Sequence, residues 1–159
     1  MTGEGTNPCD SEIGDFAELL KPLDGTAPPV LVGGHAVGFW SRHFLRKGLT
    51  QLLPYLPFRS KDLDLHGDLS LLERLHHHFK GKLRLSEPRS PVFGRLEIPT
   101  RSGRVLKIEV LHTVHGLGPK DLRRTVDVEV DCISARTLLP HIVLKAKLAN
   151  AATIPQEGR

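Results

Sequence analysis

Two aspartates separated by one residue are the first sign of chemistry in this chain. Asp62 and Asp64 lie in the stretch SKDLDL that spans residues 60–65. Charged and apolar residues alternate over 61–66, which predicts a half-buried strand on which residues two apart point to the same side. Two carboxylates held this close repel each other unless a cation lies between them, and their hard oxygen ligands suit Mg²⁺ or Mn²⁺. The same spacing also occurs on solvated strand faces, so the pair alone leaves both interpretations open.

A pair of glycines is the second feature. The short apolar run at residues 30–32 ends in Gly33 and Gly34, and residues 35–45 carry apolar side chains at helical spacing. Glycine allows a sharp turn and a close approach of the backbone to a ligand. The start of the following helix offers unpaired N–H groups and a positive dipole end, which suit a phosphate. A plain connection between a strand and a helix has the same composition.

A third carboxylate comes from a later strand. The alternation over residues 104–112 places Glu109 and Lys107 on one face and aliphatic residues on the other. A third acid beside the first two would complete a two-metal site for phosphoryl-type transfer. Residues 126–131 compete for this role with three acids on one face, Asp127, Glu129 and Asp131. An acid at every outward position is typical of a solvated face, so Glu109 is preferred.

The elements that must position these residues can be predicted along the chain. The patterns predict helices at 11–20, 35–45 and 69–79, strands at 30–32, 61–66, 82–86, 92–98, 104–112 and 125–130, and a loop with at most one helical turn at 48–60. A final helix is predicted from Ser134 or Thr137 through residue 148 or beyond. This order indicates an α/β (α+β) fold with a mixed β-sheet flanked by helices, not a doubly wound parallel sheet.

Length and composition favour one cytoplasmic domain. The chain has 159 residues, two cysteines far apart in sequence and a net charge of +4. We expect residues 1–159 to form a single domain, with residues 1–10 disordered. No apolar run is long enough for a membrane span, the N-terminus does not resemble a signal peptide, and the cysteines lack zinc-site spacing. The mild positive charge is compatible with an anionic ligand such as a nucleoside triphosphate or RNA.

The joint order of these motifs resembles the DNA-polymerase-β-like nucleotidyltransferase superfamily. In that superfamily a hydrophobic strand ends in GG or GS, a DxD or DxE strand follows, and a third acid lies on a later strand. The stretch LVGGHAVGFWSRHF followed by PFRSKDLDLHGD looks like the AbiEii-type and minimal nucleotidyltransferases, which include toxin–antitoxin components. The resemblance covers roughly residues 30–148 and implies the nucleotidyltransferase fold.

The resemblance implies a role for each residue that matches the family's motifs. The residues implied to bind the nucleotide are Gly33, Gly34, Ser60 and Lys147. The residues implied to be catalytic and to bind metal are Asp62, Asp64 and Glu109. Lys147 takes the place of a phosphate-contacting lysine on the family's late helix. The third acid is more often aspartate in the family.

The implied activity is metal-dependent nucleotidyl transfer. With Mg²⁺ or Mn²⁺, a nucleoside monophosphate would pass from a triphosphate to a hydroxyl on RNA, such as tRNA, or on a protein. The alternative is a non-catalytic module of the same fold that binds a nucleotide or a partner protein, such as a cognate toxin or antitoxin. AbiEii-type enzymes carry a further KD-x-x-D-like motif after the late helix, and this sequence lacks it before Arg159. We therefore expect a truncated or reduced member that binds nucleotide and transfers it slowly or not at all.

Overall fold

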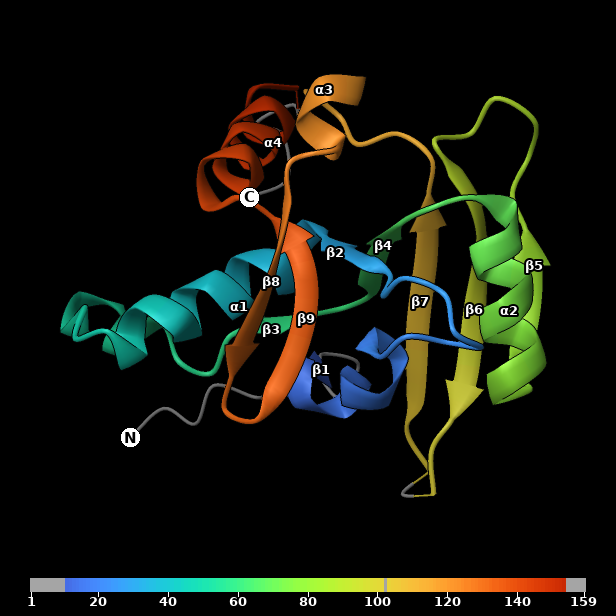
Figure 1. Ribbon diagram of the computed structural model, residues 1–159, viewed down its shortest axis with the longest axis horizontal. Helices are drawn as coiled ribbons and strands as arrows, with labels where there is room; N and C mark the ends of the chain where they lie inside the picture. Colours follow the sequence, from blue (N-terminus) through green and yellow to red (C-terminus); the bar gives the residue numbers. More distant parts are fainter. Residues whose placement is uncertain (1–10, 102, 154–159) are drawn as a thin grey trace.

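The computed structural model describes residues 11–101 and 103–153, in which helices pack around one large sheet (Figure 1). The helices are η1 (Ile13–Leu20), α1 (Gly33–Arg46), η2 (Thr50–Tyr55), α2 (Leu69–Phe79), α3 (Pro119–Leu122) and α4 (Pro140–Thr153), where η denotes a 3₁₀-helix. The strands are β1 (Ser11–Glu12), β2 (Val30–Val32), β3 (Arg59–Ser60), β4 (Leu63–His66), β5 (Lys82–Leu85), β6 (Val92–Pro99), β7 (Val105–Leu111), β8 (Thr125–Val130) and β9 (Ile133–Leu138).

The large sheet is mixed. Its seven strands follow the order β5-β6-β7-β4-β2-β9-β8, and β1 and β3 pair separately. In the centre, β4 is antiparallel to β2 and parallel to β7, while β2 is parallel to β9. The pairs at both edges are antiparallel hairpins. The predicted α/β class with a mixed sheet is confirmed at this level.

The strands that carry the glycine turn and the acids are direct neighbours in the middle of the sheet. β2 leads into the turn, β4 carries Asp64 and β7 carries Glu109. Their inward residues, among them Leu31, Leu65 and Ile108, are completely buried. Burial on one side fixes the strand register, because a slip of one residue would turn the aliphatic side chains out and the acids in.

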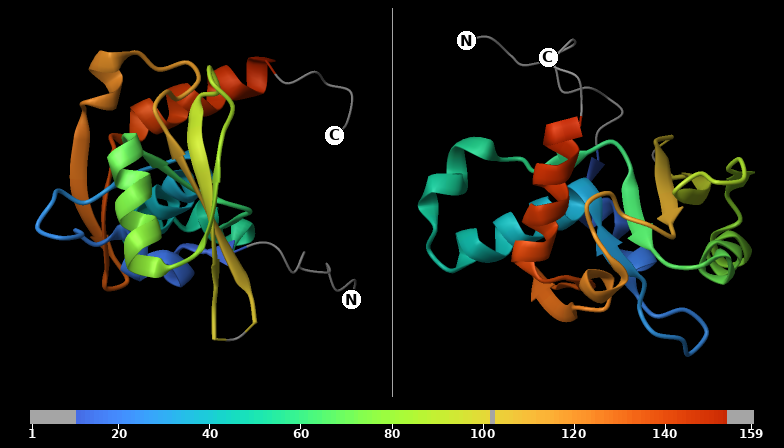
Figure 2. Two further views of the ribbon diagram at one scale, coloured as in Figure 1. Left: turned by 90° about the vertical axis from the view of Figure 1, so that its right-hand side faces the viewer. Right: turned by 90° about the horizontal axis from the view of Figure 1, so that it is seen from above.

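Helix α2 covers only one face of the β5–β7 region. It packs on β6 and β7 with Leu72 and Leu75 completely buried, and Figure 2 shows it on one side of these strands. The side chain of Asp68 caps its start by accepting a hydrogen bond from the Leu71 N–H at 2.8 Å. On the other side of the sheet, α1 packs against β4 and α4 and extends with η2 away from the sheet, opposite to β5 (Figure 1).

The prediction for the end of the chain was wrong in one element. Residues 133–138 form β9, where a helix was predicted to start at Ser134 or Thr137, and α4 begins only at Pro140. Asp131 and Cys132 have φ of 52° and 64°, the left-handed values of a tight hairpin turn, so the chain folds back and pairs β9 with β8. Proline suits the first turn of a helix, which explains the later start.

Other boundaries differ by a few residues. α1 begins at Gly33 instead of residue 35, and β4 begins at Leu63, which leaves Asp62 in the bend before the strand. Residues 13–20 form a 3₁₀-helix, and η2 provides the turn of helix allowed within 48–60. The expected disorder of residues 1–10 lies outside the described residues. Within the described part of the chain, no helix is long and apolar enough to span a membrane.

Candidate functional site

Asp64 and Glu109 lie side by side on one face of the sheet. They are register partners in the parallel pair β4–β7, and Asp62 precedes them on the β4 side. Leu63 and Leu65 point the other way and are completely buried. The structure therefore brings together the three acids that the sequence indicated, on the face opposite the aliphatic residues.

The carboxylate of Asp64 sits directly on the glycine turn. Val32, the last residue of β2, is the register partner of Asp64, so the chain enters the turn beside this side chain. Gly33 has a φ of +67°, and a Cβ at this position would overlap the Asp64 carboxylate. The N–H of Gly34 donates a hydrogen bond to that carboxylate. The turn needs glycine at position 33 both for its left-handed backbone and for the space that Asp64 fills.

Asp64 has a strongly perturbed acidity. Its pKa is raised from 3.8 to about 7, chiefly by burial and then by the nearby charges of Glu109 and Asp62, while Lys147 and the Gly34 hydrogen bond act in the opposite direction. A buried carboxyl among other carboxylates is disfavoured in its charged form unless a cation compensates. A perturbed acid of this kind is characteristic of functional sites.

This raised pKa predicts a pH-dependent stability change. Because the folded-state pKa is raised, the native state binds a proton that the unfolded chain releases, so stability is lost as the pH rises toward 7. We expect Asp64→Asn, without divalent metal, to raise the free energy of unfolding at pH 8 by on the order of 2 kcal/mol, and the Tm by roughly 4–8 °C. Urea unfolding should show the gain disappear toward pH 4. A gain of equal size at pH 4 and pH 8 would contradict the assigned pKa.

Glu109 is held by an arginine that sequence reasoning did not single out. Arg95 on β6 is the register partner of Glu109, and its Nε lies 2.5 Å from Oε1 of Glu109. The Glu109 side chain is only 14% exposed, whereas that of Arg95 is 65% exposed. Beside them a small polar cavity of about 150 Å³ is lined by Asp62, Arg95, Glu97, Lys107, Ile108 and Glu109. The alternating polar positions 95 and 97 were the only sequence signal for these residues.

The donor types fit a divalent cation, although the side chains do not converge on one point. Within residues 11–101 and 103–153, no three His, Cys, Asp or Glu side chains are arranged to hold a metal ion as they stand. Asp62, Asp64 and Glu109 are nevertheless neighbours with oxygen ligands of the kind that Mg²⁺ takes. Burial and the charges of Glu109 and Asp62 raise the pKa of Asp64, so a cation beside it would favour its charged form. Glu109 would have to exchange Arg95 for the metal.

Lys147 and Ser60 border the site from two other elements. Lys147 on α4 is close enough to Asp64 to lower its pKa, whereas Lys145 forms an ion pair with Asp121 at 2.7 Å. The geometry therefore singles out Lys147 from the two lysines of this helix. The hydroxyl of Ser60 lies against the backbone of Gly34, where a Cβ would overlap it.

The contact between Gly34 and Ser60 gives a double-mutant prediction. We expect Gly34→Ala to lower the free energy of unfolding by about 1–2 kcal/mol and nucleotide affinity about tenfold, because the new methyl group displaces Ser60. In a Ser60→Ala background the overlap with the hydroxyl is removed and only a tight contact with the Cβ of residue 60, at 3.0 Å, remains. Because alanine is also the better helix former, the same change should then cost clearly less. Urea unfolding of all four proteins measures this coupling. Equal losses in both backgrounds would contradict the contact.

The three competing acids of residues 126–131 lie away from this site, and Glu129 accepts a hydrogen bond from Ser134. Asp127 pairs with Arg136, and Asp131 pairs with Arg42 and Arg46. β8 is an edge strand separated from β4 by β9 and β2. The competing acids thus do not reach Asp62 and Asp64, which leaves Glu109 as the acid beside them.

Comparison of the chain with protein-family models, with curated proteins and with solved structures finds no match in any of the three.

Proposed function

We propose that this chain is a metal-dependent nucleotidyltransferase with the DNA-polymerase-β-like nucleotidyltransferase fold. The observation that carries the proposal is the seating of Asp64 on Gly33, between the end of β2 and the start of α1, beside Asp62 and Glu109. A two-glycine turn that opens a helix offers N–H groups to phosphates, and the acids stand next to it. The substrates would be a nucleoside triphosphate and a hydroxyl on RNA, such as tRNA, or on a protein.

Each residue has a defined task in this proposal. The Gly33–Gly34 turn and Ser60 would hold the triphosphate, with the positive charge of Lys147 beside it. Asp62, Asp64 and Glu109 would hold Mg²⁺, which supplies charge neutralisation at the phosphates and activation of the acceptor oxygen. The Asp64 carboxyl, with its pKa near 7, would lose its proton when the cation binds.

The direct test is a single-turnover transfer assay. The full chain is incubated with Mg²⁺ and each radiolabelled nucleoside triphosphate in turn, together with total tRNA or total cellular protein. We expect label to pass to one of these acceptors, and we expect no transfer with Asp64→Asn. Absence of transfer with all four nucleotides and both acceptors would contradict an enzyme, and label transfer that persists in Asp64→Asn would contradict this site.

A second function, binding without transfer, is favoured by the Arg95–Glu109 ion pair. Arg95 occupies the carboxylate that a second metal would need, so the protein could bind a nucleotide or a partner protein, such as a toxin or antitoxin, without turnover. Nucleotide binding without any transfer in the assay above would select this alternative.

The ion pair also predicts the effect of removing Arg95. We expect Arg95→Gln to raise Mn²⁺ affinity about tenfold, because Glu109 is released and a competing positive charge is lost. Arg84→Gln is the matched control, since Arg84 is the register neighbour of Arg95 on β5 and is exposed. Calorimetric titration measures the Mn²⁺ affinity of both variants. An unchanged or lower Mn²⁺ affinity in Arg95→Gln would show that Arg95 does not compete with the metal for Glu109.

A further inference from the structure

A second hollow lies beside the acid site and shares Lys147 with it. It is a groove of about 530 Å³ between α1, η2 and α4. Along α1 its wall is formed by Val37, Trp40 and Phe44, and across the groove by Leu52 and Leu144. From Val37 to Phe44 the wall spans two helical turns, or about 10 Å. The groove is therefore long enough for two turns of an incoming helix.

The surface around the groove is unusually apolar. The exposed apolar side chains that line it are Val37, Phe44, Leu49 and Leu144. The same part of the chain also exposes Leu53, Tyr55, Leu56 and Leu148, which lie in or next to η2 and in α4. Leu144 is 58% exposed and Leu148 is 62% exposed, on the same helix. A contiguous patch of this kind on a folded protein marks an interaction surface.

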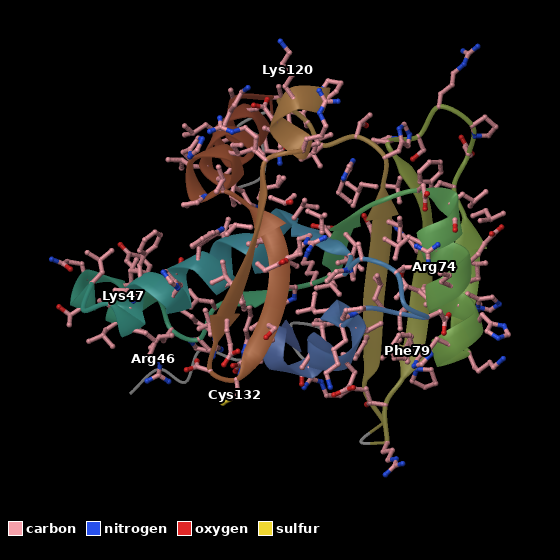
Figure 3. All side chains as sticks on the ribbon, viewed as in Figure 1. Arg46, Lys47, Arg74, Phe79, Lys120 and Cys132 are labelled. Carbon is pink, nitrogen blue, oxygen red and sulfur yellow. The ribbon has the colours of Figure 1, made fainter. Side chains whose placement is uncertain are left out.

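Acidic residues are absent from the sequence segments that form this surface. Residues 33–61 and 133–153 contain no Asp or Glu, in a chain that has 18. His141 and Lys147 line the groove, and exposed Lys47 lies in the chain between the lining residues Phe44 and Leu49. Figure 3 shows Lys47 at the C-terminal end of α1, whereas Arg46 lies toward the β8–β9 turn, where it pairs with Asp131. The groove thus has an apolar floor and a basic rim, which complements a ligand with an apolar face and acidic flanks.

Two other occupants fit less well. A nucleotide would use only the end of the groove at Lys147, because the rest of the lining, from Val37 and Trp40 to Leu52 and Leu144, is apolar. A second copy docked with twofold symmetry would place this acid-free surface against itself and bring like charges together.

We propose that the groove between α1, η2 and α4 is the docking site for an amphipathic helix of a partner protein. Apolar side chains at helical spacing enter between Phe44 and Leu144, and carboxylates on either side meet Lys47, His141 and Lys147. This mode of recognition uses the apolar stripe of a helix for affinity and its charged flanks for orientation and specificity. The groove adjoins the acid site at Lys147, but the proposal does not depend on nucleotidyl transfer.

Trp40 makes the groove directly observable, because it is the only tryptophan of the chain and lines the groove. The probe is a designed peptide of about 18 residues with leucines at 3–4 spacing and glutamates flanking them. One matched peptide has lysine in place of each glutamate, and another has the same composition in scrambled order. We expect the acidic amphipathic peptide to change Trp40 fluorescence saturably, with an affinity at least about tenfold higher than either control peptide.

Variants of the full chain locate the binding. Leu144→Asp should abolish the fluorescence change. Lys47→Glu should lower the affinity for the acidic peptide about threefold to tenfold and reduce the salt dependence of that affinity. Leu85→Asp is the matched control, since Leu85 is an equally exposed leucine, 67% accessible, on the distant strand β5. Thermal unfolding confirms that each variant is folded, so a lost signal reports the groove.

The opposite outcomes overturn the proposal. Failure of the acidic peptide to bind the folded wild-type chain, or equal binding of all three peptides, contradicts an acidic helix as occupant. Dimer formation that Leu144→Asp abolishes would assign the groove to a second copy of the chain. A nucleotide-induced change of Trp40 fluorescence that Leu144→Asp abolishes would assign it to the nucleotide.

Discussion

Replacement of both Asp62 and Asp64 by asparagine is expected to lower Mn²⁺ affinity at least about 100-fold while the chain stays folded. The two carboxylates provide most of the negative charge at the site, and asparagine keeps the shape and one oxygen acceptor without the charge. After Asp64→Asn, the amide oxygen can still accept the hydrogen bond that the Gly34 N–H donates to the carboxylate. Calorimetric titration of Mn²⁺ measures the loss, and circular dichroism confirms the fold.

The matched control for this pair lies on β8. Asp127→Asn with Glu129→Gln removes two acids of the same spacing on an edge strand, where Asp127 pairs with Arg136. This control should leave Mn²⁺ affinity unchanged. If the Asp62→Asn/Asp64→Asn variant bound Mn²⁺ as tightly as the wild type, the assignment of a metal site to Asp62 and Asp64 would be wrong. An equal loss of Mn²⁺ affinity in the β8 variant would contradict it too.

Gly33→Ala is expected to have the second large effect. Its φ of +67° is strained for any residue with a Cβ, and the new methyl group would overlap the carboxylate of Asp64. The strain costs about 1–3 kcal/mol and displacement of a buried carboxylate adds to it, so we expect a total loss of at least about 3 kcal/mol in the free energy of unfolding. Nucleotide binding by the remaining folded fraction should also be lost, because the turn can no longer close on a phosphate.

Gly25 provides a close control for the backbone strain alone. It has a φ of +72°, yet a Cβ there would meet no heavy atom within 4 Å. Gly25→Ala should therefore cost only the strain of about 1 kcal/mol and leave nucleotide binding intact. Urea unfolding of both variants separates the two contributions. Equal losses for Gly25→Ala and Gly33→Ala would show that the contact with Asp64 contributes nothing.

The face shared by the acids could be predicted from sequence because strand alternation is local. Buried Leu63 and Leu65 and the aliphatic residues of β7 leave only one side for Asp64 and Glu109. That the two are neighbours depends on strand order, which periodicity does not contain. The resemblance led us to expect that Asp64 and Glu109 are neighbours, and the register of β4 and β7 shows this directly.

Features that depend on strand register or on pairing within the sheet could not be predicted. Arg95 reaches Glu109 because β6 folds back on β7 in one particular register, and the sequence shows only an arginine among alternating residues. The missed strand β9 has the same origin. Residues 133–138 are compatible with a helix when taken alone, and pairing with both β8 and β2 makes them a strand.

The most direct test of the central claim is calorimetric titration of each nucleoside triphosphate into the full chain, with Mg²⁺ and with EDTA. If the acids and the glycine turn form one nucleotide site, at least one triphosphate binds with Mg²⁺, and binding is lost with EDTA and in the Asp62→Asn/Asp64→Asn protein. The opposite result is that the folded wild-type chain binds no triphosphate, or binds one equally well with EDTA and in the double variant. Either finding would contradict a metal-dependent nucleotide site at Asp62, Asp64 and Gly33.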